Sequence, residues 1–338
     1  MKSIVFFLIP LLSRFSRLSS QVTPARLDYT TVVTFGDDNS DTGNAYRLSN
    51  RTWPPVPPFN PDGSFADARL WNQILTDYYL ANASLENFAY ESATTDSQQV
   101  QGTMGRNPNL LANYTVRNST RAPGVRQQII QYISSKANLE LDLDRILYVV
   151  TVGFNNYQFN RSLTPSDTVQ SIVDCLNRLI FFGARNLLVM NQFPYDRFPR
   201  FRNRTTTNVT KALYAKHNEL LAEKMNENYL SSNTRLRIRL FDSHALVSNI
   251  LNNYMAYGFD NLDPCWNTET GTSVIVQCDN VSRRVFTDEY HLSSSMHALL
   301  AREVYAVLGE FNATATALRT MSPNVYLVVL LILSIVGR

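Results

Sequence analysis

Hydrophobic and polar positions form two alternating patterns along the chain. Short, continuous apolar runs rich in β-branched residues are typical of strands buried on both faces. Four such strands are predicted, at residues 30–37, 146–153, 186–192 and 236–242. Between and after them, apolar residues recur at helical spacing. These segments predict helices at residues 68–80, 123–136, 165–184, 212–230, 244–255 and 293–311. Residues 95–120 are mostly polar, so we expect a surface excursion there.

The order of these elements predicts the fold class. Strands alternate with helices, and strands buried on both faces need helices on both sides. The sequence therefore predicts an α/β protein, a three-layer α/β/α sandwich around a parallel sheet. Functional residues of such sheets gather where the carboxyl ends of the strands meet their loops. FGDDNSDTGN (35–44) and VGFNN (152–156) each follow a predicted strand and lead into a helix, so both belong at that edge.

Composition and charge narrow the class of protein. A chain of 338 residues with 44% hydrophobic residues can bury a full core, which excludes global disorder. Its formal net charge of +3 comes from its ends, which carry Lys2, Arg14, Arg17, Arg319 and Arg338 and no acidic residue. Without these five, 26 basic side chains face 28 acidic ones, about −2. Nothing in this balance indicates nucleic-acid binding.

Both ends of the chain carry apolar segments. Residues 1–20 combine a basic start, an apolar run at 4–12 and small residues, a pattern that predicts a secretory signal peptide cleaved before Gln21. A single domain is expected over residues 21–312. The tail, 313–338, ends in an apolar run at 326–336 that resembles a glycolipid-anchor signal; an unprocessed hydrophobic terminus is the alternative. We therefore expect a secreted, extracellular protein, with attachment to the cell surface left open.

Sequons and cysteines agree with an oxidising, extracellular compartment. Nine Asn-x-Ser/Thr acceptors predict a glycoprotein: Asn50, Asn82, Asn113, Asn118, Asn160, Asn203, Asn208, Asn280 and Asn312. Cys265 and Cys278 bracket a loop-like segment and could close it as a disulfide. Cys175 lies on an amphipathic helical stretch and is expected to be a buried free thiol. No cysteine and histidine spacing predicts a metal site, and no glycine-rich phosphate loop indicates a nucleotide cofactor.

Four segments together resemble one family. FGDDNSDTGN resembles the FGDSxSDTGN block of the GDSL, or SGNH, ester hydrolases, and NFAYESATTD (87–96) resembles their NYAxGGATTD block. VGFNN resembles VGxND, and FTDEYH (286–291) resembles FxDxxH. The blocks occur in the family's order across nearly the whole mature chain. The chain is similar above all to secreted, fungal-type members related to carbohydrate acetyl esterases.

The resemblance implies a flavodoxin-like α/β/α fold and Ser-His-Asp acyl transfer without a cofactor. His291 matches the family's general base and Asp288 the residue that orients it. Asn155 matches the side-chain donor of the oxyanion hole. The implied substrates are carbohydrate acetates or small esters, handled by a monomer.

Three departures from the family pattern put this activity in doubt. Asp38 stands at the position of the nucleophilic serine. Glu91 and Ser92 replace the two glycines of the second block, and Asn156 replaces the aspartate of the third. Glu91 would repel a developing oxyanion if it pointed into the site, whereas the main-chain N–H of Ser92 could still donate to it.

Asp38 is a poor nucleophile for an ester, because its carboxylate leaves the tetrahedral adduct more readily than an alkoxide does. At a helix start, we expect it to form an inert Asp38–His291⁺–Asp288 cluster. The chain is then predicted to be a secreted, esterase-like glycoprotein with lost or strongly reduced activity and a glycan-binding role, or a structural surface glycoprotein. The alternative is an active ester hydrolase that uses Ser40, otherwise a helix-capping residue with Asp41, or water activated by His291. Trp53, Phe59 and Trp71 are candidates for a sugar-facing rim or for ordinary packing.

Overall fold

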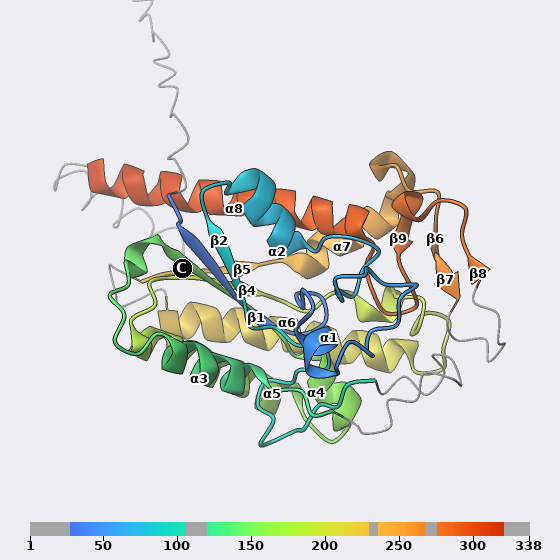
Figure 1. Cartoon of the computed structure of the whole chain (residues 1–338), viewed down its shortest axis with the longest axis horizontal. Helices are drawn as coiled ribbons and strands as arrows, with labels where there is room; N and C mark the ends of the chain where they lie inside the picture. Colours follow the sequence, from blue (N-terminus) through green and yellow to red (C-terminus); the bar gives the residue numbers. More distant parts are fainter. Residues whose placement is uncertain (1–27, 106–119, 230–235, 268–275, 321–338) are drawn as a thin grey trace, which may run out of the picture. The chain divides into compact units, whose positions relative to one another are not determined.

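The computed structural model describes residues 28–105, 120–229, 236–267 and 276–320. One compact unit spans Leu27–Leu308, and the fold below is that of this unit (Figure 1). The predicted signal peptide, the apolar run at 326–336, Asn113 and Asn118 lie outside the described residues. None of the described helices combines the length and apolarity that crossing a membrane would require.

A five-stranded parallel sheet forms the centre of the unit. Its strands are β1 (Thr31–Gly36), β2 (Ser84–Asn87), β3 (Ile146–Thr151), β4 (Asn186–Met190) and β5 (Arg237–Phe241). They lie in the order β2-β1-β3-β4-β5, and every neighbouring pair is parallel. This is the flavodoxin-like strand order. The predicted parallel sheet is therefore confirmed, with β2 as an edge strand that the hydrophobic pattern missed.

Helices cover both faces of the sheet, which makes three layers (Figure 1). One face carries α2 (Trp71–Ile74) with the π-helical η1 (Leu75–Tyr79), α7 (Ser243–Asn252) and α8 (Ser294–Thr320). The other carries α3 (Val125–Ser135), α5 (Pro165–Phe182) and α6 (Thr207–Tyr229). The short α1 (Asn44–Leu48) and α4 (Phe154–Phe159) follow the β1 and β3 ends. The predicted three-layer fold class is confirmed.

Smaller elements fill the connections. The 3₁₀ turns are η2 (Leu143–Arg145), η3 (Tyr195–Arg197), η4 (Tyr254–Tyr257) and η5 (Val281–Arg283). Two two-stranded sheets precede α8: β6 (Asn261–Pro264) pairs with β9 (Arg284–Phe286), and β7 (Trp266–Asn267) with β8 (Val276–Gln277). The predicted pair Cys265 and Cys278 forms a disulfide across this region, and Cys175 is a buried free thiol.

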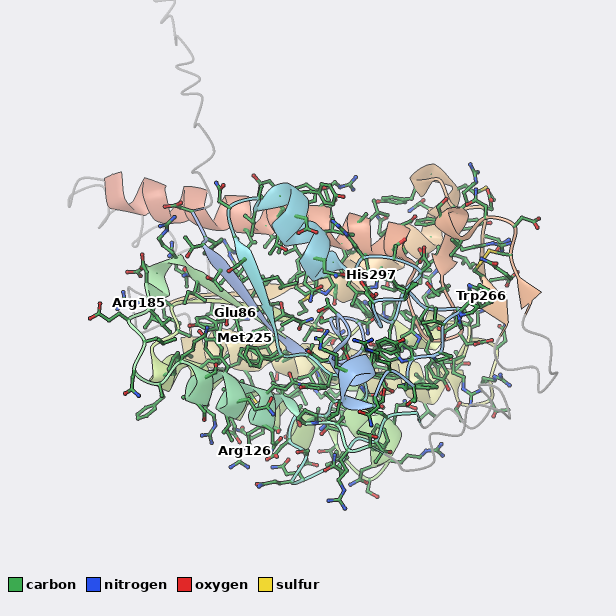
Figure 2. All side chains as sticks on the ribbon, viewed as in Figure 1. Glu86, Arg126, Arg185, Met225, Trp266 and His297 are labelled. Carbon is green, nitrogen blue, oxygen red and sulfur yellow. A yellow bond between two sulfur atoms is a disulfide. The ribbon has the colours of Figure 1, made fainter. Side chains whose placement is uncertain are left out.

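Alternating strand residues supply two separate cores, because successive side chains of a strand point to opposite faces. Leu147 and Val149 of β3 pack with α8 residues such as Leu300. Tyr148 and Val150 pack with α3 and α5 on the other face. Figure 2 shows side chains filling the space on both sides of the sheet. Because both faces of these strands are buried, their sequences are continuous apolar runs.

Three local predictions differ from the structure. The helix after β1 begins only at Asn44, so Asp38 lies in a turn and not at a helix start. The stretch predicted as a surface excursion is partly buried, since Asp96, Val100 and Met104 are inaccessible; residues 106–119 lie outside the described part. The last helix continues to Thr320 and not to residue 311.

Candidate functional site

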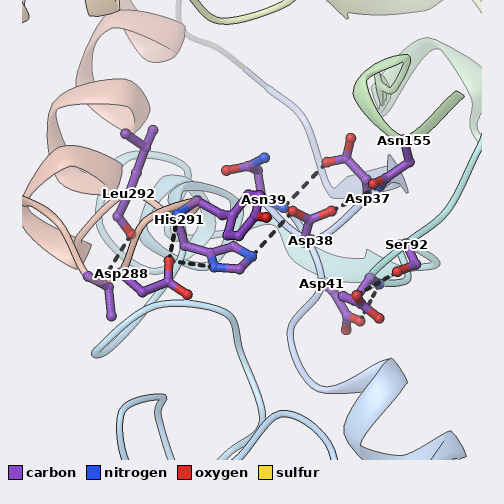
Figure 3. A network of polar contacts seen from close by, with 12 residues as sticks. Asp37, Asp38, Asn39, Asp41, Ser92, Asn155, Asp288, His291 and Leu292 are labelled. Carbon is purple, nitrogen blue, oxygen red and sulfur yellow. Dashed lines mark hydrogen bonds and ion pairs between the residues drawn. The ribbon is translucent and has the colours of Figure 1, made fainter. Parts of the chain in front are cut away.

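Five polar side chains from four segments of the chain meet at the carboxyl edge of the sheet. Asp38 follows β1, Ser92 follows β2, and Asn155 lies in the first turn of α4, just after β3. Asp288 and His291 come from the connection between β9 and α8. Figure 3 shows the His291 ring between Asp288 and Asp38. Because parallel strands end at the same edge, residues distant in sequence converge here.

Asp288 fixes the His291 ring from one side. The Nδ1 atom of His291 lies 2.8 Å from Oδ1 of Asp288. The same oxygen accepts the backbone N–H groups of Tyr290 at 2.9 Å and of His291 at 2.7 Å. Asp288 is fully buried, so its carboxylate is confined to this position. Phe59 and Phe65 pack on the ring with centroid distances of 5.2 and 5.3 Å.

Asp38 engages the opposite nitrogen of the same ring. Its Oδ2 atom lies 3.4 Å from Nε2 of His291. Its Oδ1 atom accepts a hydrogen bond of 3.1 Å from the side-chain amide of Asn155. Asp38 and Asn155 are both buried. Nε2 is the atom with which His291 would take a proton if it acted as a general base. This atom already faces a carboxylate.

Charges set the protonation states of the cluster. Burial alone would lower the pKa of His291, but the charges and hydrogen bonds of Asp288 and Asp38 outweigh it and raise this pKa to about 10. For Asp38, burial opposes ionisation, yet His291 and Asn155 hold its pKa below the ordinary value. His291 is thus protonated at neutral pH, with both ring N–H groups directed at carboxylates.

Buried acids surround this cluster. Asp37 is buried directly behind Asp38, and burial together with repulsion from Asp38 raises its pKa well above the ordinary value. Asp41 accepts hydrogen bonds from the backbone N–H groups of Asn44 and Ala45, and from that of Glu91 at 2.8 Å. Asp41 therefore caps α1 and ties the second motif block to the first.

Glu91 and Ser92 lie on the wall of the site. Ser92 has φ 63°, a left-handed conformation that is uncommon for a residue with a side chain. Its Oγ donates to Oε1 of Glu91 at 2.5 Å. Burial, opposed by this hydrogen bond, and repulsion from Asp38 and Asp41 raise the pKa of Glu91 to about 8. Glu91 therefore lines the site mainly as a neutral acid at pH 7.

A cavity of about 320 Å³ opens over the cluster. Besides Asp38, Glu91, Ser92, Asn155, Asp288 and His291, it is lined by Trp53, Phe59, Phe65, Phe154, Gln158, Phe159, Arg161, Arg200 and Tyr290. Six of these fifteen lining residues are Trp, Phe or Tyr, and a volume of this size suits a small ligand. No group of three or more His, Cys, Asp or Glu side chains fit to hold a metal ion occurs in the described ranges.

Comparison with known proteins identifies the family. The model of the GDSL-like lipases/acylhydrolases matches residues 32–304. The chain belongs to this family. It is 24% identical over 292 residues to a thermolabile hemolysin of Vibrio parahaemolyticus, covering 81% of this chain and 62% of that protein. It is 25% identical over 204 residues to a phosphatidylcholine-sterol acyltransferase of Aeromonas hydrophila, covering 60% of this chain and 56% of that protein. The chain thus spans less than two thirds of the length of these relatives.

Solved structures with a similar arrangement include esterases. The carbohydrate acetylesterase Est24 of Sinorhizobium meliloti has a TM-score of 0.46 at 12% identity, covering 83% of this chain and 99% of that one. A lipolytic G-D-S-L family protein of Veillonella parvula has a TM-score of 0.45 at 11% identity, covering 82% of this chain and 97% of that one.

Ser40 does not belong to the reactive part of this GDSL-family site. Its Oγ accepts a hydrogen bond of 3.1 Å from Nε1 of Trp71, and its carbonyl accepts from the side chains of Asn72 and Asn87. The residue is fully buried. The use of Ser40 as a displaced nucleophile stays a prediction that these contacts do not favour, and its predicted capping role is wrong, because its side chain bonds Trp71 and no side-chain hydrogen bond from Ser40 caps α1. Trp71 is likewise a core residue and not part of a rim, whereas Trp53 and Phe59 do line the cavity.

Asn156 joins two GDSL-family motif blocks to each other. Its Oδ1 accepts from the Thr95 N–H at 2.9 Å, and its Nδ2 donates to Thr95 Oγ1 at 2.8 Å. The sequence shows Asn156 as a departure from the family motif, but it does not predict the contact with Thr95. Arg161, Arg200 and Tyr290 were missed as cavity residues, although Tyr290 lies within the fourth motif block.

Proposed function

We propose that this GDSL-family protein has lost serine-dependent ester hydrolysis and uses the remaining cavity to bind a small carbohydrate-like ligand. The proposal takes Asp38 as the occupant of the nucleophile position. The observation that carries it is the contact of Asp38 Oδ2 with Nε2 of His291. A serine hydroxyl at this place would be activated by His291, whereas the carboxylate instead pairs with the protonated ring.

The chemistry of an ester at this site supports loss of turnover. If Asp38 attacked the ester carbonyl, the adduct would expel the carboxylate again, because it is a far weaker base than the alkoxide. Loss of a triad nucleophile typically costs about 10⁴–10⁶ in rate. Activation of water needs a neutral His291, but its pKa of about 10 keeps the ring protonated at neutral pH. Hydrolysis through His-activated water is therefore disfavoured.

The walls of the cavity support a binding role. Aromatic rings offer flat apolar faces, and a few polar groups among them can fix the orientation of a ligand. Trp53 Nε1, Glu91 Oε2 and Asp288 Oδ2 are buried without a hydrogen-bond partner among the described residues, and all three residues line the cavity. Unpaired buried polar groups are costly, at about 1–3 kcal/mol each. Asn155, Gln158 and Arg161 also line the cavity and add polar side chains to its wall.

We also propose that the chain is a secreted, fungal-type glycoprotein. Among the described sequons, Asn50, Asn82, Asn203, Asn208 and Asn280 are exposed, and Asn160 is half-buried. Exposure is what a glycosyl transfer to these side chains requires. A mass decrease after peptide N-glycosidase treatment of the secreted chain tests this proposal; an unmodified chain in the medium would contradict it.

The Asp38→Ser variant tests the loss of catalysis. We expect the natural chain to show no turnover of 4-nitrophenyl acetate above buffer and no labelling by a fluorophosphonate probe. Asp38→Ser should gain both, and adding His291→Ala should abolish the gain. Ser40→Ala is the matched control and should change neither result. Turnover by the natural chain that disappears in His291→Ala would refute the proposal.

A further inference from the structure

Asp38 presents a charged and accessible carboxylate to the cavity. Three carboxyl groups line this space, those of Asp38, Glu91 and Asp288. The Asp288 side chain is only 1% exposed, and burial raises the pKa of Glu91 to about 8, so Glu91 is mainly neutral at pH 7. The Asp38 side chain is 11% exposed. Burial opposes its ionisation, but His291 and Asn155 hold its pKa below the ordinary value.

A carboxylate that fails on esters is a competent nucleophile at saturated carbon. In attack on an ester carbonyl, the carboxylate is the better leaving group and is expelled again. In a displacement at saturated carbon, the bond that breaks lies on the far side of that carbon, so the carboxylate stays attached as an ester. Asp38 is therefore unfit for acyl transfer and fit for alkyl transfer.

The two oxygens of Asp38 are held differently (Figure 3). Oδ1 accepts a hydrogen bond of 3.1 Å from the side-chain amide of Asn155. Oδ2 lies 3.4 Å from Nε2 of His291, which is longer than an ordinary N–H···O hydrogen bond, so it is the less tightly held oxygen. If Oδ2 becomes alkylated, Oδ1 is the carbonyl oxygen of the ester. The Asn155 amide then donates to the atom that becomes negative when water adds to that ester.

The charges of the site favour an epoxide over other carbon electrophiles. An alkyl halide would release an anion beside the buried Asp288 carboxylate, which is unfavourable. An epoxide oxygen instead takes up a proton and becomes a hydroxyl group. His291 carries such a proton, because the carboxylates of Asp288 and Asp38 outweigh burial and raise its pKa to about 10. The rings of Phe59 and Phe65, which line the cavity, suit a small, weakly polar molecule.

We infer that the protein opens small epoxides, with Oδ2 of Asp38 attacking a ring carbon and His291⁺ giving its Nε2 proton to the epoxide oxygen. One bond forms between Oδ2 and the ring carbon, and the bond between that carbon and the epoxide oxygen breaks. The electron pair of the broken bond takes the proton. The products are a hydroxyalkyl ester of Asp38 and a neutral imidazole. This activity goes beyond the ligand binding proposed above and does not depend on it.

The same residues then hydrolyse the ester. Esterification removes the Asp38 charge, one of those that hold the pKa of His291 at about 10 against burial, while Asp288 still contacts Nδ1. The neutral Nε2 takes a proton from water, and the hydroxide adds to Cγ of Asp38. The adduct breaks its bond between Cγ and Oδ2, and the diol leaves with the proton from Nε2. The new acid on Asp38 returns a proton to Nε2, so one epoxide and one water give one diol.

Oxygen-isotope labelling in a single turnover tests the inference. The full chain, in excess over styrene oxide, reacts in ¹⁸O-labelled water, and mass spectrometry follows the diol and the peptide that contains Asp38. Because the bond between Cγ and Oδ2 breaks, the diol takes Oδ2 with it and the water oxygen stays on the protein. We therefore expect a first diol without ¹⁸O and an Asp38 that has gained one ¹⁸O atom.

Variants identify the nucleophile. Asp38→Asn keeps the size of the side chain and should lower diol formation by at least about a hundredfold, because the nucleophile is lost. Asp77→Asn is the matched control, since Asp77 lies on η1, is 45% exposed and does not line the cavity. It should leave the rate unchanged. Circular dichroism of Asp38→Asn separates lost chemistry from lost folding, and the isotope experiment on the natural chain needs no variant.

Several results would overturn the inference. An ¹⁸O atom in the first diol would show that water attacks the epoxide directly. Turnover that survives in Asp38→Asn, or a folded natural chain that gives neither diol nor Asp38 adduct, would exclude Asp38 as the nucleophile. An Asp38 adduct that accumulates without diol would refute the hydrolytic step. Turnover of 4-nitrophenyl acetate by the natural chain and by Asp38→Ser is measured separately, so the proposed loss of ester hydrolysis stands or falls on its own.

Discussion

Replacing Asp38 by asparagine should release His291 from its fixed protonated state. The change keeps the size of the side chain and removes only its charge. In the natural chain the His291 pKa is raised to about 10, with burial acting against two carboxylates. Asp288 remains in the variant and still holds Nδ1, so the ring stays in place while one of its two counter-charges is gone.

The size of the effect follows from the geometry. Opposite unit charges 3.4 Å apart attract by about 4–5 kcal/mol at an effective dielectric constant of about 20. One pKa unit corresponds to about 1.4 kcal/mol, so this charge sustains at most about 3.5 pKa units. The side chains of His291 and Asp38 are only 13% and 11% exposed, so solvent screens the pair weakly. We therefore expect the His291 pKa to fall by about two to three units in Asp38→Asn, to about 7–8.

Proton NMR of the imidazole Cε1–H groups measures this directly. The sequence contains only four histidines, so an isotope-labelled sample gives few signals, and His291→Gln assigns the one of interest. His217 and His297 are matched internal controls, because burial lowers the pKa of each to about 3 and they should not titrate near neutrality in either protein. A His291 titration that is the same in Asp38→Asn and in the natural chain would refute the ion cluster and the account of lost catalysis.

Two further predictions concern stability. The folded-state pKa values of His291 and Glu91, about 10 and about 8, both lie above their ordinary values of 6.5 and 4.5. Each group therefore contributes stability that is full below its ordinary pKa and is lost as pH rises through its folded pKa. Urea unfolding should show declining stability from about pH 5 to 10, and His291→Gln should flatten the part above pH 8; a profile unchanged by that substitution would contradict this. Removing the Cys265–Cys278 disulfide, which closes a loop with a sequence separation of 13, should cost about 3 kcal/mol. Thermal unfolding of the double alanine variant would show this as a lower Tm, and an unchanged Tm would contradict it.

How much of the fold the sequence predicts depends on where each strand lies. β1, β3 and β4 pair on both sides and are covered on both faces, so nearly all their side chains are apolar and the runs are easily recognised. β2, with the sequence SLEN, pairs only with β1 at the edge; its first residue is exposed and the other three are half-buried. Its residues need not be apolar, so no hydrophobic pattern marks it. The single helix predicted over 68–80 is instead α2 followed by the π-helical η1, a difference in hydrogen bonding that periodicity does not resolve.

The sequence predicts which side chains meet wherever a motif fixes a residue to the end of a strand. Asp38 and Asn155 follow β1 and β3, so the parallel topology alone brings them together. The hydrogen bond between Ser40 and Trp71 could not be predicted, because the two residues are 31 positions apart and a local pattern cannot show the contact. Arg161 and Arg200 were missed for the same reason: they lie in loops whose positions are set by the packing of α4, α5 and η3.

Under the proposed function, the residue at position 38 decides both the protonation state of His291 and whether a nucleophile is present. Asp288, Phe59 and Phe65 hold the His291 ring whatever occupies position 38, so the ring is already placed to act on a neighbouring hydroxyl. If position 38 is the nucleophile position, as proposed, Asp38 offers no hydroxyl there, and the protonated Nε2 of His291 faces its carboxylate. Raising the pH above 10 would neutralise the ring, yet it would not restore acyl transfer, because the carboxylate still leaves the adduct first. Only a change at position 38 removes both obstacles together.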